Sequence, residues 1–218
     1  MPFLFFGLFA IDILLAVCEA GPKGNKKHYA IAKTLLLPLL FLACAAIRKN
    51  PPLLPFLSLF FGWLGDICLL KKKQKKLFLA GMLFFAAGHI AYSIACLRIC
   101  GTATLQTDVL SGLFFLIYIV LLILGKPRLT LLRGKLSAAA TVYGLILAFF
   151  GFSAARCCLS CRTLPAAAVL VGSLLFIFSD SLLSVQAFRQ KTPHGNMFVI
   201  GSYALAQACI SAGLILLY

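Results

Sequence analysis

Apolar runs follow one another along almost the entire chain, and they restrict the folds that it can adopt. Hydrophobic residues make up 62% of the sequence and charged residues 11%, with a mean hydropathy of +1.05. Soluble domains carry about 25% charged residues. A run of roughly 20 apolar residues is long enough to cross the hydrocarbon core of a membrane as a helix. The sequence therefore predicts an all-α integral membrane protein.

Eight such runs, separated by short joints, predict a bundle of eight transmembrane helices. The predicted spans are, approximately, residues 3–18, 30–47, 53–70, 77–97, 108–124, 136–155, 165–185 and 197–217. The first run follows no basic segment and contains an acid, so we interpret it as a span and not as a signal peptide. No joint is long enough to form a soluble domain, so residues 1–218 are predicted to form a single transmembrane helical domain.

The basic residues lie mostly in the joints and predict an orientation. Fourteen of the 20 Lys and Arg residues fall on one side of the predicted bundle, five on the other, and Lys33 falls within the second span. Because cytoplasmic joints are enriched in Lys and Arg, the richer side is predicted to be cytoplasmic and both termini extracytoplasmic. The rule is the same for a bacterial cell (inner) membrane and for the endoplasmic reticulum of a eukaryote. The net charge of +15 would suggest nucleic acid in a soluble chain, but no nucleic-acid motif is present and no such partner is predicted.

Two aspartates inside predicted spans are the strongest candidates for chemistry, because an acid in a membrane span is costly. Asp66 lies five residues before Lys71, and Asp180 lies nine before Arg189, which places them about 7 and 13 Å from the cytoplasmic end at 1.5 Å per residue. A carboxyl kept from water favours its protonated form. Two facing carboxyls would titrate separately, as one acid and one carboxylate. The structural alternative is that each pairs with a lysine or a helix end.

Other polar residues fall in the same half of the predicted membrane. His89 and Tyr92, spaced i, i+3, share a helix face and can orient an aspartate or water, bind a phosphate, or simply bridge helices. Tyr203 and Gln207, spaced i, i+4, can reach the same cavity or hold helices together. Lys33 can neutralise an acid, bind phosphate or extend its ammonium outward.

Three further features have mainly structural interpretations. Asp12, in the first span, is interpreted as a local partner of Lys33. A cysteine cluster in one short loop can pair or bind a metal, but no histidine completes a zinc site, so no metal is predicted; its members are Cys157, Cys158 and Cys161. Glycines in the third and fourth spans are expected to allow close helix approach; they are Gly62, Gly65, Gly81 and Gly88.

The two halves of the chain show a weak sequence similarity to one another. Gly65-Asp66 and Ser179-Asp180 each end a span before a basic joint, and the two acids are 114 residues apart, about half the chain. This offset is that of a four-plus-four parallel duplication, which transporters also show. Motifs of serine lipases, zinc proteases and nucleotide-driven proteins are absent from the sequence.

At these residues the chain resembles the YhhN family of multi-pass membrane proteins. The resemblance rests on G-D, F-x-x-G and a-x-x-H-x-x-Y in the first half, and on G-x-x-x-F-x-x-S-D and Y-x-x-x-Q in the second. Here these are Gly65-Asp66, Phe78 to Gly81, Ala86 to Tyr92, Gly172 to Asp180, and Tyr203 with Gln207. Position 204 is Ala, where the family often has a second tyrosine.

The characterised animal members of that family are lysoplasmalogenases, so the resemblance implies hydrolysis of the sn-1 vinyl ether of a lysophospholipid drawn from the membrane. It implies Asp66 and Asp180 as the acid and the carboxylate, without assigning which is which, and no metal or organic cofactor. The residues expected to bind substrate are Lys33, His89, Tyr92, Ser179, Tyr203 and Gln207. The alternatives are a proton-coupled transporter that uses the same acids as a relay, and a non-catalytic lipid-binding or scaffold protein.

Overall fold

The computed structural model describes residues 2–48, 50, 52–71, 74–102, 104–125, 135–188 and 192–218. Within these residues the chain forms eight helices and no strand, so the prediction of an all-helical chain is confirmed. The helices are α1 (Pro2–Glu19), α2 (Lys26–Ala45), α3 (Leu53–Leu69), α4 (Lys75–Cys100), α5 (Leu105–Gly125), α6 (Lys135–Cys161), α7 (Leu164–Phe188) and α8 (Gly195–Leu217).

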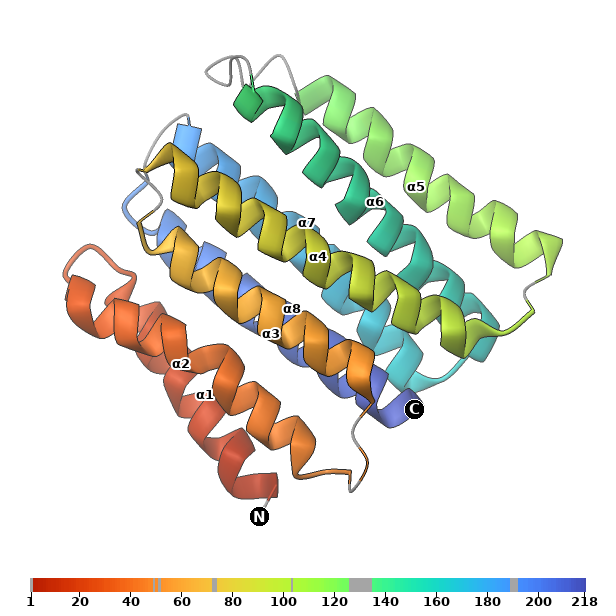
Figure 1. Ribbon diagram of the computed structural model, residues 1–218, viewed down its shortest axis with the longest axis horizontal. Helices are drawn as coiled ribbons and strands as arrows, with labels where there is room; N and C mark the ends of the chain where they lie inside the picture. Colours follow the sequence, from red (N-terminus) through yellow and green to blue (C-terminus); the bar gives the residue numbers. More distant parts are fainter. Residues whose placement is uncertain are drawn as a thin grey trace.

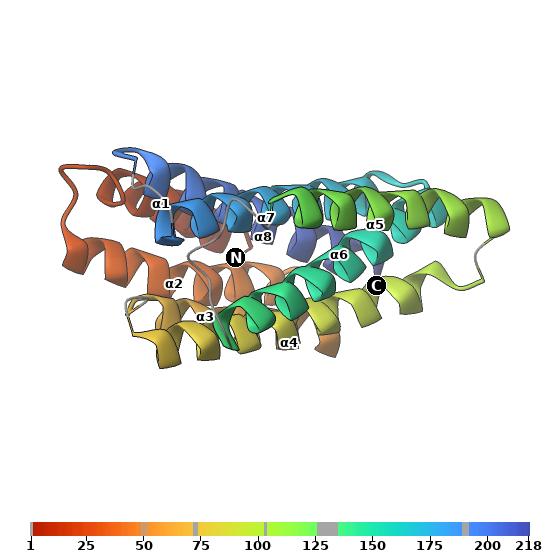
Figure 2. The same cartoon turned by 90° about the horizontal axis from the view of Figure 1, so that it is seen from above.

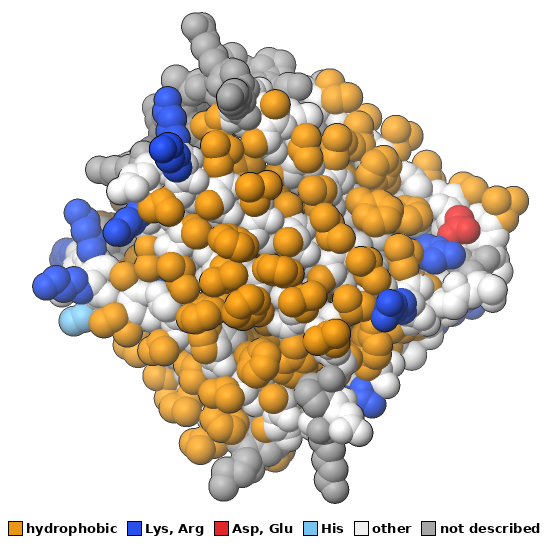
Figure 3. Space-filling model, viewed as in Figure 1, with side chains coloured by type: hydrophobic (Ala, Val, Ile, Leu, Met, Phe, Trp, Pro, Cys, Tyr) orange, Lys and Arg blue, Asp and Glu red, His pale blue; other side chains and the backbone are white. Residues whose placement is uncertain are grey.

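Five of the helices in the described residues are long and apolar enough to cross a membrane, namely α2, α4, α6, α7 and α8. The apolar stretches of α3 (Leu53–Leu69) and of α5 (Leu105–Val120) are shorter. Many large apolar side chains face outward, and Figure 3 shows them as a broad belt, with the Lys and Arg side chains drawn on this face near its edges. The chain is an integral membrane protein; a total of eight crossings, the orientation and the four-plus-four duplication stay predictions.

The helices form two layers. Figure 2 shows α1, α8, α7 and α5 in one layer and α2, α3 and α4 in the other, with α6 inclined between them. Consecutive helices run in opposite directions, so both termini lie at the same end of the bundle (Figure 1). The opposite end carries the α1–α2, α3–α4 and α7–α8 joints, and it is called the basic end below. Helix α8 packs against α1, α2, α3, α4 and α7, which makes it the central helix.

Glycines allow α3 and α4 to approach closely, as the sequence predicts. A Cβ atom on Gly88 would lie 3.1 Å from the backbone oxygen of Ser58, and one on Gly81 would lie 3.3 Å from the backbone oxygen of Gly65. Helices in a membrane gain little from apolar burial against lipid, so close contact between backbones contributes much of their association. This contact holds the end of α3, which carries Asp66, against α4.

One prediction about local structure is wrong. Cys157, Cys158 and Cys161 do not form a loop, because α6 continues to Cys161. These residues occupy the last turns of that helix, and all nine cysteines of the chain are free thiols. Arg156, which looks like part of a joint in the sequence, lies within α6 and forms an ion pair with Asp108 of α5, with 2.6 Å between Nε and Oδ1.

Candidate active site

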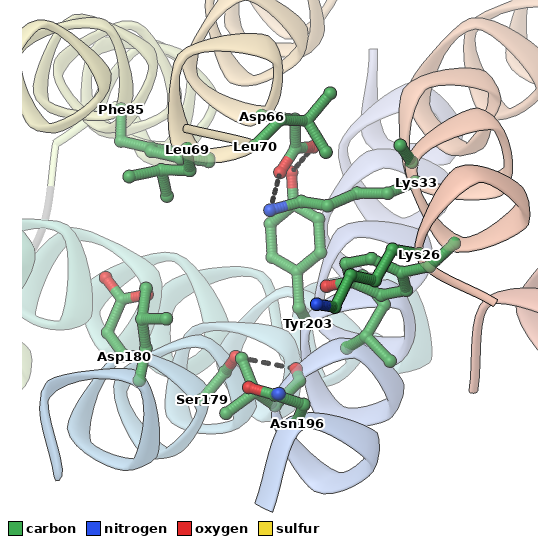
Figure 4. A pocket seen from close by; sticks show the side chains of 15 residues that line it. Lys26, Lys33, Asp66, Leu69, Leu70, Phe85, Ser179, Asp180, Asn196 and Tyr203 are labelled. Atoms are coloured by element: carbon green, nitrogen blue, oxygen red, sulfur yellow. Dashed lines mark hydrogen bonds and ion pairs between the residues drawn. The ribbon is translucent and has the colours of Figure 1, made fainter. Parts of the chain in front are cut away.

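A cavity of about 220 Å³ lies between α2, α3, α4, α7 and α8, toward the basic end. Three of its lining residues, Lys26, Leu70 and Asn196, are exposed, so the cavity reaches the surface there. Figure 4 shows polar side chains entering it from α2, α3, α7 and α8. The lining residues used below are Lys26, Tyr29, Lys33, Asp66, Ser179, Asp180, Asn196 and Tyr203, with apolar walls from Leu69, Leu70, Phe85, Leu183 and Ile200.

Asp66 enters the cavity from the last turn of α3 with both carboxylate oxygens engaged. The hydroxyl of Tyr203, from α8, donates a hydrogen bond of 2.6 Å to Oδ2. The ammonium of Lys33, from α2, lies 3.2 Å from Oδ1, and the two side chains are 12% and 2% exposed. Figure 4 shows Lys33 and Tyr203 converging on this carboxylate. Two consecutive helices, α2 and α3, and the last helix, α8, are thus joined at one acid.

The pairing of Lys33 corrects one interpretation made from the sequence. Lys33 does not pair with Asp12, and its ammonium does not extend outward, because the side chain points inward to Asp66. A carboxylate as deeply buried as Asp66 is strongly destabilised unless a cation compensates it. Asp12 is also buried, and its Oδ2 has no hydrogen-bond partner among the described residues.

Asp180 enters the same cavity from α7, on the opposite side from Asp66 (Figure 4). Its carboxyl is partly buried and accepts a hydrogen bond from the hydroxyl of Tyr143, on α6. No Lys or Arg of the described residues forms an ion pair with it. Asp66 and Asp180 therefore share one cavity but have different partners, a lysine with a tyrosine in one case and a tyrosine in the other.

Ser179 lies beside Asp180 and ties α7 to α8. Its hydroxyl donates a 2.9 Å hydrogen bond to the backbone oxygen of Val199, and the side chain is almost completely buried. Ser179 and Val199 both line the cavity. This contact fixes the position of Asp180 relative to the helix that carries Tyr203.

Tyr92 and Gln207 lie behind the cavity and do not line it. The hydroxyl of Tyr92 donates to Oε1 of Gln207 over 2.9 Å and lies 3.1 Å from the hydroxyl of Ser211. A Cβ atom on Gly62 would be 3.5 Å from Nε2 of Gln207 and 3.9 Å from the hydroxyl of Tyr203. Gly62 therefore leaves the space in which these two side chains of α8 meet α3.

His89 also lies outside the lining of the cavity, in an aromatic environment. Its Nδ1 is 2.7 Å from the backbone oxygen of Phe85, and its ring centroid is 4.3 Å from that of Phe176. A carbonyl oxygen can only accept, so we assign the proton to Nδ1, which leaves Nε2 as an acceptor. Nε2 is buried and has no partner within the described part of the chain.

The sequence-predicted residues thus divide into two groups. Those that line the cavity are Lys33, Asp66, Ser179, Asp180 and Tyr203; those behind it are His89, Tyr92 and Gln207. Tyr143 was not predicted; its one signal in the sequence is a tyrosine within an apolar run, because a buried phenol needs a hydrogen-bond partner. Tyr29 and Asn196 were not predicted either, because they belong to no motif. In the described residues, no group of three or more His, Cys, Asp and Glu side chains is arranged to hold a metal ion.

Comparison with known proteins identifies relatives of this chain. It is 30% identical over 164 residues to lysoplasmalogenase TMEM86A of Bos taurus, which covers 72% of this chain and 62% of that protein. It is 33% identical over 155 residues to lysoplasmalogenase TMEM86B of Sus scrofa, which covers 71% of this chain and 60% of that protein. The matches thus span about three fifths of the length of each relative. No solved structure matches the chain significantly. A sequence model of the YhhN family matches residues 28–214, and the chain belongs to this family.

Proposed function

We propose that the protein is a hydrolase that cleaves the sn-1 vinyl ether bond of lysoplasmalogens, releasing a fatty aldehyde and a glycerophospho-head-group. The observation that carries the proposal is the pair of acids, Asp66 and Asp180, which enter one cavity with different partners. The names of the two mammalian relatives support the same reaction. The substrate is a lysophospholipid taken from the membrane in which the protein lies.

The reaction requires one proton donor and one stabilising carboxylate. A proton is added to the vinyl carbon that does not carry the oxygen, which leaves an oxocarbenium ion on the other carbon. One water adds to that carbon and loses a proton, giving a hemiacetal. The hemiacetal then expels the glycerol oxygen, which takes up a proton, and the aldehyde remains. Two-carboxylate glycosidases stabilise a similar cation with the same pair of groups.

In this proposal we assign a different role to each acid, because the two acids have different partners. Asp66 is the carboxylate, since a buried ion pair with Lys33 requires its ionised form. It stabilises the oxocarbenium ion. Asp180 has no such cation among the described residues, so it holds the proton that is transferred to the vinyl carbon. The hydrogen bond from Tyr143 leaves the other oxygen of Asp180 free to face the substrate.

The walls of the cavity suit a lipid with one chain. Leu69, Leu183 and Ile200 provide apolar contacts next to the two acids, and Leu70 is 37% exposed at the rim. An alkenyl chain can lie against this apolar side while the glycerol and the phosphate face the polar end. We therefore place the vinyl ether between Asp66 and Asp180.

The test is aldehyde release by the purified protein in detergent, supplied with lysoplasmenyl-ethanolamine. The reaction is also run in D₂O, and the aldehyde is reduced to the alcohol as it forms, so that it cannot exchange hydrogen with the solvent. The proposed mechanism then places one deuterium on the carbon next to the one that carried the aldehyde. Asp66→Asn and Asp180→Asn are expected to lower kcat by about 100-fold or more. The matched control is Asp108→Asn, since this acid is 45% exposed and pairs with Arg156 outside the cavity.

Three outcomes would contradict the proposal or part of it. Loss of activity in only one of the two cavity variants would make the other aspartate structural. Equal loss in Asp108→Asn would point to a general defect in folding. A folded wild-type protein that releases no aldehyde would exclude this hydrolase and favour the transporter, which is then tested by proton-coupled uptake into liposomes.

A further inference from the structure

Three polar residues at the mouth of the cavity have no part in the chemistry described above. Lys26 and Tyr29 come from the first turn of α2, and Asn196 comes from the first turn of α8. All three line the same cavity as Asp66 and Asp180. In Figure 4 the side chains of Lys26 and Asn196 lie on the side of the pocket away from Asp66.

Lys26 is available for an anion, whereas Lys33 is not. Lys33 is neutralised by Asp66 at 3.2 Å. No acidic side chain of the described residues pairs with Lys26. The nearby Glu19 has other partners: its Oε2 accepts a hydrogen bond from the backbone N–H of Asn25, and its Oε1 lies 3.4 Å from Nδ1 of His28. The side chain of Asn25 accepts from the backbone N–H of Lys27 at 2.9 Å, which caps α2 and fixes the turn that carries Lys26.

The depth of these residues matches the layout of a lysophospholipid. Lys26 precedes Lys33 by seven residues, and Asn196 precedes Tyr203 by seven residues. Both pairs are therefore separated by about 10 Å along their helices, at 1.5 Å per residue. In the substrate the glycerol separates the vinyl ether from the phosphate by a few bonds. When the vinyl ether lies between the two aspartates, the phosphate lies toward the mouth.

We propose that Lys26, with Asn196 and Tyr29, binds the phosphate of the lysophospholipid and selects phosphorylated substrates over neutral ether lipids. The ammonium supplies the charge, and the amide and phenol supply hydrogen bonds to phosphate oxygens. This inference rests on the proposed hydrolase activity, and it adds a determinant of specificity that is separate from the two acids.

The test compares two substrates with the same alkenyl chain, at a fixed mole fraction in uncharged detergent micelles. One is lysoplasmenyl-ethanolamine, and the other is the 1-alkenylglycerol, which lacks the phosphate. Lys26→Ala is expected to lower kcat/KM for the phospholipid by about 10- to 100-fold, mainly through KM, since it removes a charged hydrogen bond. For the alkenylglycerol, kcat/KM is expected to change less than about twofold, since no phosphate contact is lost.

The matched control is Lys27→Ala. Lys27 is exposed on the same turn and carries the same charge, but it does not line the cavity. If Lys27→Ala has the same effect as Lys26→Ala, the cause is the charge of the whole surface and not a site. If Lys26→Ala lowers kcat/KM equally for both substrates, or for neither, the phosphate site is rejected.

A binding measurement separates failure of this inference from failure of the proposed reaction. Glycerophosphoethanolamine is titrated into the protein by calorimetry, with no turnover required. The expected result is binding that is weakened at least about tenfold by Lys26→Ala and unchanged by Lys27→Ala. A wild-type protein that hydrolyses neither lipid but binds this head group in that pattern would keep the site and reject the reaction. Equal binding by wild type and Lys26→Ala would reject the site.

Discussion

The hydroxyl of Tyr143 donates a hydrogen bond to the carboxyl group of Asp180, across the interface of α6 and α7. The two residues are 37 positions apart in the sequence. Both are partly buried, and the ring of Tyr143 packs against His89, with 6.0 Å between the ring centroids. Tyr143 thus holds the carboxyl of the proposed proton donor from behind the cavity, and it is a positioning residue in the proposed reaction.

Tyr143→Phe is expected to lower kcat about tenfold and to leave KM within about twofold, because one hydrogen bond to a carboxyl contributes about 1.5 kcal/mol. The measurement is aldehyde release at saturating and limiting substrate. The control is Tyr118→Phe, which removes a hydroxyl from the neighbouring α5 that makes no hydrogen bond to Asp180. In an Asp180→Asn background, Tyr143→Phe should have little further effect on kcat. Additive losses in the double variant would mean that Tyr143 acts independently of Asp180.

Removing both charges of the Lys33–Asp66 ion pair is expected to affect stability and activity differently. Lys33→Met leaves a buried carboxylate without a cation, so it is expected to lower the free energy of unfolding by about 3–5 kcal/mol. Lys33→Met combined with Asp66→Asn removes both charges and should recover most of that stability, without recovering activity. Thermal unfolding in detergent and aldehyde release measure the two effects. A double variant as unstable as Lys33→Met alone would show that the lysine contributes through packing and not through charge.

Two tyrosines with similar burial are expected to behave differently. Tyr203 donates to Asp66 within the cavity, so Tyr203→Phe should lower kcat about tenfold through loss of one hydrogen bond to a charged group. Tyr92 donates to Gln207 behind the cavity, so Tyr92→Phe should lower the free energy of unfolding by about 1 kcal/mol and change kcat less than about twofold. Equal loss of kcat in the two variants would make Tyr92 part of the reacting site.

The positions of the helices could be predicted because each apolar run is marked in the sequence itself. The end of α6 could not be predicted in this way. Arg156 and Ser160 lower the local hydropathy, and the sequence does not show that Arg156 pairs with Asp108 on α5. The interpretation of that segment as a loop failed because the polar residue is satisfied by a partner 48 positions away in the sequence.

The two aspartates that line the cavity stand out in the sequence because an acid within a span is costly. Their partners could not be predicted, because these depend on how each helix is rotated about its axis. From the sequence, Lys33 could neutralise an acid, bind phosphate or extend outward. In the structure its Nζ lies close to Oδ1 of Asp66, which favours the first of these. Tyr143 and Asn196 belong to no recognised motif, and only the packing of α6 against α7, and of α7 against α8, brings them to the cavity region.

The close packing of α7 against α8 predicts a strong effect of a small substitution at Gly172. A Cβ atom there would lie 2.9 Å from the backbone oxygen of Ala206 and 2.7 Å from Cγ1 of Ile210. The backbone oxygen cannot move without shifting α8, so Gly172→Ala is expected to lower the free energy of unfolding by about 1–3 kcal/mol. It should also lower activity, because Asp180 lies eight residues further along the same helix.

The matched control for this prediction is Gly112→Ala on α5. A Cβ atom at Gly112 would meet nothing within 4 Å. Alanine has the higher helix propensity, by about 1 kcal/mol, so this variant should be as stable as wild type or slightly more stable. Thermal unfolding of both variants in the same detergent is the measurement. If Gly172→Ala is as stable as Gly112→Ala and fully active, then α7 and α8 can separate enough to admit a methyl group, and the position of Asp180 does not depend on that contact.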